Sequence, residues 1–128
     1  MKMTVLAAIA AGGAIGSLLR HFVSMVESPS WTGFPYGIFI VNVSGGFIMG
    51  LLTELLALKF HVSPETRAFL TTGVMGGYTT FSTFSLQSAL LIERNAYLSA
   101  AVYIAGSALL SIAALFCGLW LVRGMYAH

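Results

Sequence analysis

The chain has 128 residues, of which 58% are hydrophobic and 8% are charged, with a formal net charge of +2. Soluble domains carry about 25% charged residues, so this composition excludes a soluble globular protein and indicates an integral membrane protein. The single cysteine, Cys117, excludes a disulfide within the chain and a cysteine-based metal site.

The charged residues bracket four long apolar stretches. Each stretch reaches or approaches the roughly 20 residues that a helix needs to cross the hydrocarbon core of a bilayer. The sequence therefore predicts an all-α membrane protein with a single domain, residues 1–128. Its four transmembrane helices are expected at about residues 3–26, 37–58, 65–92 and 96–122.

The first span has an apolar part that is too long for a cleavable signal peptide, so we expect it to remain as a helix. Its Ala8, Gly12 and Gly16 recur every four residues, which lets another helix approach closely. Arg20 lies in the last third of the same stretch. This side chain either extends its charged end to the interface or faces a water-filled vestibule, and both interpretations remain open.

Residues 27–36 form a predicted loop, because prolines and glycines gather there. The second span carries Asn42, with Gly46 and Gly50 on the same face. An amide inside a membrane span needs a partner. Asn42 either bonds a packed helix or lines a pore, where its NH2 group donates to an anion. Glu54 lies near the end of this span, as a solvated interfacial residue rather than a proton carrier.

The third span contains an unusual polar run, Gly73–Ser85, with the sequence GVMGGYTTFSTFS. Gly76 and Gly77 each cost about 1 kcal/mol in a helix relative to Ala, so we predict that this helix is broken near its middle. In lipid, the freed backbone groups must be buried in protein, line a watery cavity or bind an ion. The break is therefore a candidate site, and Phe81 and Phe84 after it would place both rings on nearly one face.

The fourth span carries hydroxyl groups at every fourth residue, at Ser99, Tyr103, Ser107 and Ser111, which predicts a polar track. Hydroxyls, an amide NH2 and the rims of aromatic rings offer positive charge and suit an anion. The carbonyl oxygens of a broken helix suit a hard cation such as Na+. Because the chain has no catalytic motif and no nucleotide-binding loop, we expect neither an enzyme nor a nucleic-acid partner.

Four spans place both termini on the same side of the membrane. Four Lys and Arg residues then lie on one side and two on the other, and this weak bias leaves insertion in both orientations open. Four helices rich in small residues make a thin wall for a pore. We therefore expect a homo-oligomer in the lipid bilayer.

The segment GGYTTFSTFS, from Gly76 to Ser85, resembles the signature of the Fluc fluoride channels, also called CrcB proteins. A GxxxR pattern ending at Arg20, the Asn at position 42 and the hydroxyls of the fourth span fall in the same order, so the resemblance covers essentially the whole chain. It implies a channel of the bacterial plasma (inner) membrane that exports toxic fluoride passively. It also implies an antiparallel dual-topology homodimer with two pores and a structural Na+ at its centre.

The same resemblance implies roles for individual residues. Phe81 and Phe84 would point ring edges at fluoride, with Asn42 close by. Arg20 would attract the anion to a vestibule, and the backbone carbonyls of Gly76 and Thr79 would hold Na+. Hydroxyls would form the polar track at Tyr103, Ser107 and Ser111, and would line the pore or cap the broken helix at Thr80, Ser82 and Thr83.

Two positions depart from the family pattern. Many members have Thr where this chain has Ile38, and an acidic residue where it has Gln87. Both positions are expected to lie away from the phenylalanine rings, so the departures concern only details of the vestibule.

Two other classes of function compete with a channel. A small multidrug or other secondary transporter also has four spans, but it needs an ionisable residue at mid-membrane to couple protons, and the nearest acid is Glu54 near a helix end. A non-conducting membrane scaffold would explain the glycines as packing. It would not explain an Asn, two Phe and a line of hydroxyls.

Overall fold

The computed structural model describes residues 2–25 and 33–126, and these residues form an all-helical structure. The helices, in chain order, are α1 (Met3–Ser24), α2 (Tyr36–Leu58), α3 (Pro64–Ala68), the π-helix η1 (Phe69–Met75), α4 (Gly76–Tyr78), α5 (Ser82–Glu93) and α6 (Tyr97–Tyr126). The end of the first predicted span at residue 26 and most of the predicted 27–36 loop lie outside the described residues.

Three helices of the described part, α1, α2 and α6, are long and apolar enough to cross a membrane, judged by length and composition. The third predicted span is divided among α3, η1, α4 and α5, and a break separates the last two of these. Large apolar side chains point outwards, with Leu98, Leu109 and Trp120 exposed by 80, 68 and 61%. Helices that are apolar all round suit a lipid environment, so the chain is a multi-pass membrane protein.

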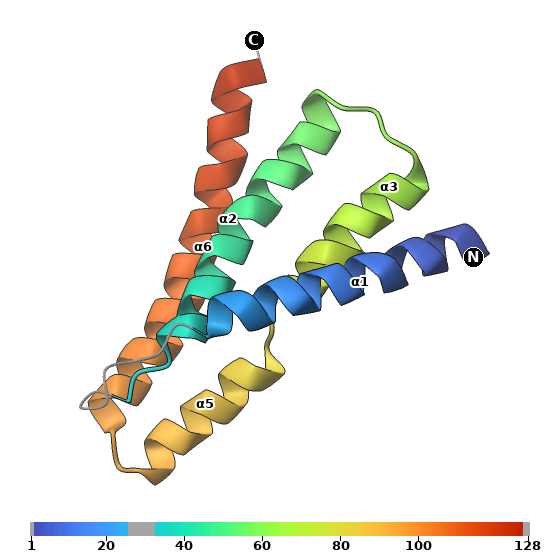
Figure 1. Cartoon of the computed structure of the whole chain (residues 1–128). Helices are drawn as coiled ribbons and strands as arrows, with labels where there is room; N and C mark the ends of the chain where they lie inside the picture. The colour runs from blue at the N-terminus through green and yellow to red at the C-terminus, as the bar shows by residue number, and fades with distance from the viewer. Residues whose placement is uncertain (1, 26–32, 127–128) are drawn as a thin grey trace.

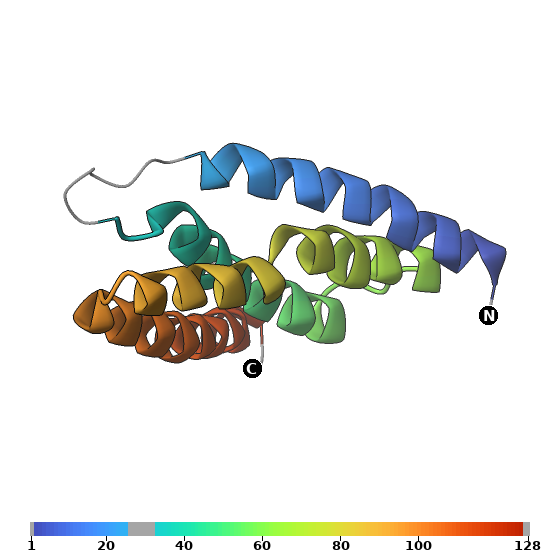
Figure 2. The ribbon, with the colours of Figure 1, turned by 90° about the horizontal axis from the view of Figure 1, so that it is seen from below.

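The helices form a layered bundle in which α2 and α6 run side by side in the same direction (Figure 1). Seen from below, α1 forms an outer layer over η1 and α4, and α6 lies on the opposite side (Figure 2). A short turn joins α5 to α6, and Asn95 in that turn has a φ of 59°.

Glycines set how closely α1 approaches η1 and α4. Both Gly12 and Gly16 are buried, and a Cβ added to Gly12 would collide with the carbonyl of Phe69. A Cβ at Gly16 would collide with the carbonyl of Val74. The four-residue pattern of small residues in the first span is therefore a packing surface, as the sequence predicts.

The α2–α6 contact, the most extensive one between helices, follows the same principle. A Cβ at Gly46 would lie 2.5 Å from the carbonyl oxygen of Ser111, and one at Gly118 would lie 2.5 Å from that of Phe47. Without side chains at these positions the two backbones come into direct contact. This contact holds the hydroxyl-bearing part of α6 against α2.

The break in the third predicted span is present, but the glycine pair does not make it. Gly76 and Gly77 lie within α4, and the backbone leaves the helix only at Thr79, with φ −82° and ψ 156°. The missing Cβ of Gly77 serves close packing instead, because a Cβ there would lie 2.5 Å from the carbonyl oxygen of Gly13 on α1. The low helix propensity of Gly76 and Gly77 is therefore not the cause of the break, contrary to the prediction.

The segment before the break is a π-helix, which the sequence did not predict. Residues Phe69–Met75 form η1, and the N–H of Gly76 at its end donates to the carbonyl of Thr71, five residues back. π-Helical turns occur inside α-helices mostly as single turns and often at functional sites.

The glycine packing predicts a contrast between neighbouring substitutions in α1. Gly16→Ala should lower the free energy of unfolding by about 1–3 kcal/mol, because its Cβ has no room against the backbone of Val74. Gly13→Ala is the matched control, since a Cβ there has nothing within 4 Å. Thermal unfolding of the two purified variants in detergent measures this difference, and equal stability would contradict it.

Candidate functional site

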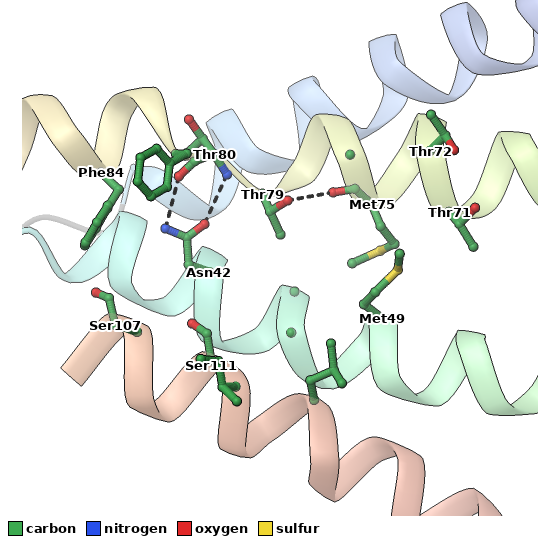
Figure 3. Close-up of a pocket in the computed structure, with 17 residues that line it drawn as sticks. Asn42, Met49, Thr71, Thr72, Met75, Thr79, Thr80, Phe84, Ser107 and Ser111 are labelled. Carbon is green, nitrogen blue, oxygen red and sulfur yellow. Dashed lines mark hydrogen bonds between the residues drawn. The ribbon is translucent and has the colours of Figure 1, made fainter. Parts of the chain in front are cut away.

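The candidate site is a cavity of about 620 Å³ beside the break, with walls from α2, from η1 and α4, from the unwound residues and from α6. In Figure 3 Asn42 reaches from α2 towards Thr80, while Ser107 and Ser111 lie on α6 on the other side of the same space. The rest of the lining is largely apolar, including Met49 and Met75. No ionisable side chain lines the cavity among the described residues.

Asn42 holds the unwound backbone through two hydrogen bonds. Its Nδ2 donates to the carbonyl of Thr80 over 3.2 Å, and the N–H of Thr80 donates to its Oδ1 over 3.1 Å. Because the backbone N–H needs an acceptor, these bonds also fix which way the amide points. Of the two interpretations left open by the sequence, the bond to another segment is therefore present, and the second N–H of Nδ2 is still able to meet an anion.

Thr80 also bonds to the first turn of the next helix, α5. The N–H of Thr83 donates to the Oγ1 of Thr80 over 3.2 Å, and the hydroxyls of Thr80 and Ser82 are 3.4 Å apart. Thr80 thus provides the side-chain cap of α5, although its burial beside the cavity also makes it a lining residue. Ser82 is exposed and Thr83 half-buried, and neither belongs to the cavity lining.

These side-chain bonds free two backbone carbonyls. In a continuous α-helix the carbonyl of Gly76 would accept from the N–H of Thr80, and that of Thr79 from the N–H of Thr83. Asn42 and the Thr80 hydroxyl take up those two N–H groups, and no other donor reaches either oxygen within residues 2–25 and 33–126. Both residues also line the cavity.

Carbonyl oxygens of this kind are ligands for a hard cation. The described residues contain no group of three or more His, Cys, Asp and Glu side chains that would bind a metal ion. The oxygens at the break that suit a cation are therefore backbone carbonyls and neutral side-chain oxygens.

The two phenylalanines of the motif lie next to each other, with ring centroids 5.6 Å apart. Phe81 stands at the start of α5 and is 79% exposed, whereas Phe84 is half-buried and its ring is 5.3 Å from that of Tyr103. Both line the cavity. The structure therefore places the two rings together, with one of them facing outwards.

Three hydroxyl groups of the predicted polar track are buried and have no hydrogen-bond partner among the described residues: Tyr103, Ser107 and Ser111. Ser107 and Ser111 line the cavity, and Tyr103 is fully buried behind Phe84. A buried hydroxyl without a partner costs about 1–3 kcal/mol, so such groups are unusual. They form a row of donors that suits a species able to accept hydrogen bonds.

Arg20 lies half-buried on α1, one turn after Gly16 and on the same face. Gly16 packs against the backbone of Val74 and Tyr78. Arg20, one turn further along α1, therefore lies towards the end of α4, near the break. No carboxylate of the described residues forms an ion pair with it. Its charge is therefore free to act on the surroundings of the site.

The expectations for Glu54 and for Ile38 need correction. Glu54 is less solvated than predicted, because its side chain is 14% exposed and pairs with Arg123 at 3.0 Å. Ile38 does not lie away from the rings: it is buried in one cluster with Tyr103, and Phe84 packs against that cluster. Gln87 is half-buried on α5.

Sequence reasoning also missed two contacts that shape the site. Ser44 on α2 and Tyr78 at the end of α4 share a hydrogen bond of 2.9 Å, which anchors the helix just before it unwinds. Phe34 packs its ring edge-on against Tyr103, with centroids 5.5 Å apart. A hydroxyl and an aromatic ring in these positions give no pattern that predicts a partner far away in the chain.

Two comparisons with known proteins, with a family and with individual relatives, agree with each other. Residues 7–119 match the family described as CrcB-like protein, Camphor Resistance (CrcB). The chain is 50% identical over 130 residues to a protein of Caulobacter vibrioides (strain NA1000 / CB15N) named fluoride-specific ion channel FluC, covering 98% of this chain and 100% of that protein.

Proteins with the same name from two other bacteria are equally similar. The identity is 50% for Rhodopseudomonas palustris (strain BisB5) and 51% for Chelativorans sp. (strain BNC1), each over 115 residues. These matches cover 89% of this chain and 93% and 92% of the two relatives. The similarity therefore includes all the helices that build the cavity.

The paired bonds of Asn42 predict a local effect at the break. Asn42→Ala should speed hydrogen exchange at the Thr80 amide by about 10- to 100-fold, because an unpaired buried N–H costs about 1–3 kcal/mol. Ser44→Ala, on the same helix, removes the bond to Tyr78 and leaves the Thr80 amide bonded. Exchange followed by mass spectrometry on peptides spanning residue 80 compares the two. Equal exchange in both variants would show that Asn42 does not hold the break.

Proposed function

This chain belongs to the family of CrcB-like proteins, and we propose that it is a fluoride-selective ion channel. In this proposal it lets toxic fluoride leave the bacterial cell passively across the plasma (inner) membrane, down the electrochemical gradient of the ion. The relatives named fluoride-specific ion channel support the choice of fluoride. The observation that carries the proposal is the row of buried, unpaired hydroxyls along α6, at Tyr103, Ser107 and Ser111.

The spacing of these donors suits an ion that moves in steps. Residues four apart on a helix are separated by about 6 Å along its axis, so an anion that leaves one hydroxyl soon meets the next. Fluoride is small and strongly hydrated, and a selective path must replace its lost water with closely placed donors. Several weak sites in a row also let the ion leave again.

The aromatic rings and the amide of the cavity present partial positive charge to an anion, and a charged residue lies nearby. The rims of Phe81 and Phe84 carry the positive part of the ring quadrupole, and Asn42 has an amide hydrogen left beside the break. Arg20 lies on the flanking helix and raises the local concentration of anions at the approach to the path. All these groups favour an anion over a cation.

Passive movement is supported by the absence of a coupling group. No ionisable side chain lines the cavity among the described residues, and Glu54 is bound to Arg123 near the far end of α2. A proton-coupled transporter needs a titratable residue that both substrate and proton reach. A channel needs none, so the residues favour a channel over the transporter alternative.

We also propose that two chains assemble as an antiparallel, dual-topology homodimer with a structural Na+ between them. The carbonyls of Gly76 and Thr79 have lost their helical donors and suit a hard cation. One chain offers two such oxygens, and a second copy would double the number. Phe81 is 79% exposed beside an apolar cavity wall, a surface that a second copy would cover. The charge of the Na+ would hold the broken helices of the two chains together.

A flux measurement on the purified protein tests the channel. Liposomes loaded with KF should release fluoride rapidly once valinomycin lets K+ follow, and liposomes loaded with KCl should not release chloride. Release that needs a proton gradient would favour a transporter. No release of either anion would contradict the proposal.

The hydroxyl row on α6 predicts that removing one hydroxyl slows fluoride conduction without lowering the stability of the protein. Ser107→Ala should slow fluoride efflux by about tenfold, because one donor worth about 1–2 kcal/mol is lost. Its stability should stay the same or rise, since an unpaired buried hydroxyl disappears. Ser88→Ala is the matched control, because Ser88 is buried but donates to the carbonyl of Phe84 in its own helix. Equal efflux from both variants would remove the row from the mechanism.

The rings of the two phenylalanines in the motif predict a second loss of fluoride efflux. Phe81→Ile and Phe84→Ile keep an apolar side chain but remove the polarised ring edge, so each should reduce fluoride efflux by about tenfold or more. The same liposome assay measures this, with thermal unfolding as the check on folding. Unchanged fluoride efflux would exclude the rings from the conduction path.

A further inference from the structure

A contact between the α5–α6 turn and the segment just before α2 lies next to Tyr103 of the hydroxyl row. Arg94, in the turn between α5 and α6, donates from Nη2 to the carbonyl of Gly33 over 3.1 Å. Gly33 has a φ of 61°, and a Cβ at this position would lie 2.8 Å from Nη1 of Arg94. Glycine therefore allows both the backbone turn and the close approach of the guanidinium group. The contact fastens the segment before α2 onto the start of α6.

Phe34 directly follows Gly33 and packs against Tyr103, one residue of the hydroxyl row. Its ring meets that of Tyr103 edge-on, with centroids 5.5 Å apart and an interplanar angle of 87°. It also contacts Tyr36 and Phe39, at 4.7 and 5.7 Å between centroids. Tyr103 is fully buried and touches Phe84 at 5.3 Å. Its ring is thus held by phenylalanines from two different segments.

The hydroxyl of Tyr103 has no hydrogen-bond partner among the described residues. A buried tyrosine usually has its ring direction fixed in part by the bond of its O–H group. Here packing alone fixes it, through the rings of Phe34 and Phe84 and the apolar side chains of the same buried cluster. A small rotation about the Cα–Cβ bond would move the hydroxyl, which stands at the far end of a rigid ring, away from its place in the row.

We propose that Phe34 and Arg94 are positioning residues for conduction. Arg94 holds the backbone at Gly33, this backbone positions the ring of Phe34, and that ring aims the hydroxyl of Tyr103 at the passing anion. Neither residue needs to touch the ion. This inference rests on the proposed fluoride channel, and it adds a support outside the motif and outside the cavity lining.

A double-substitution experiment tests the inference. Phe34→Ala should slow fluoride efflux from liposomes by about three- to tenfold, the loss that corresponds to one edge-on aromatic pair. Phe34→Trp keeps an aromatic ring and should restore most of the rate. In a Tyr103→Phe background no hydroxyl remains to be aimed, so Phe34→Ala should cause no further loss. An equal loss in both backgrounds would mean a merely structural role and would overturn the proposal.

Arg94→Ala provides a second route, because Arg94 is exposed and its replacement should not prevent folding. It should slow efflux in the wild-type background and not in Tyr103→Phe. The control is Tyr97→Phe, which removes another hydrogen bond of the same turn, to Asn95, and should leave efflux unchanged. An Arg94→Ala variant as fast as the wild type would overturn the proposal, and so would a Tyr103→Phe variant as fast as the wild type.

The wild-type protein separates this inference from the function on which it rests. If wild-type liposomes release no fluoride, the proposed channel itself fails. If the wild type conducts and the Phe34 and Arg94 variants conduct equally well, the channel stands and only the positioning role fails.

Discussion

The structure of the site depends on the pair of hydrogen bonds between the Asn42 amide and the Thr80 peptide. A peptide group that leaves a helix inside a membrane needs new partners, and one side-chain amide supplies both a donor and an acceptor. The consequences spread along the chain. The N–H of Thr80 no longer serves the carbonyl of Gly76, and the Thr80 hydroxyl takes the N–H of Thr83. The amide of Asn42 and the hydroxyl of Thr80 together therefore leave a break with two free carbonyls.

The opposite wall of the cavity depends on close backbone packing. Gly46 lets α2 approach the backbone of Ser111, so Ser107 and Ser111 on α6 face Asn42 and the break across the cavity. Larger residues at the α2–α6 contact would widen that space. In an apolar surrounding, fixed donors interact more strongly with an anion than they would in water. The glycines thus contribute to the chemistry of the site through the distances that they set.

Hydropathy and residue type were enough to predict a multi-pass helical membrane protein, a break in the third span and the family, because each depends on local composition or on a sequence motif. The cause of the break was not predictable. Gly77 is needed where the Gly13 backbone of α1 passes, and no local pattern shows a partner so far along the chain. The contact of Phe34 with Tyr103 was missed for the same reason. The roles of the site residues in conduction remain predictions.

The π-helix η1 has a consequence for the direction in which the break faces. A π-turn holds one residue more than an α-turn, so η1 takes up an extra residue without the rotation of about 100° that one more α-helical residue would add. η1 therefore keeps Thr79 and Thr80 at the same angular position relative to α2 that a shorter α-helix would give them. Loss of a single residue from Phe69–Met75 would let the segment relax into a regular α-helix, and the unwound peptide would still face Asn42. A further inserted residue would instead turn the motif by about 100°, so a one-residue insertion there should be tolerated far less than a one-residue deletion.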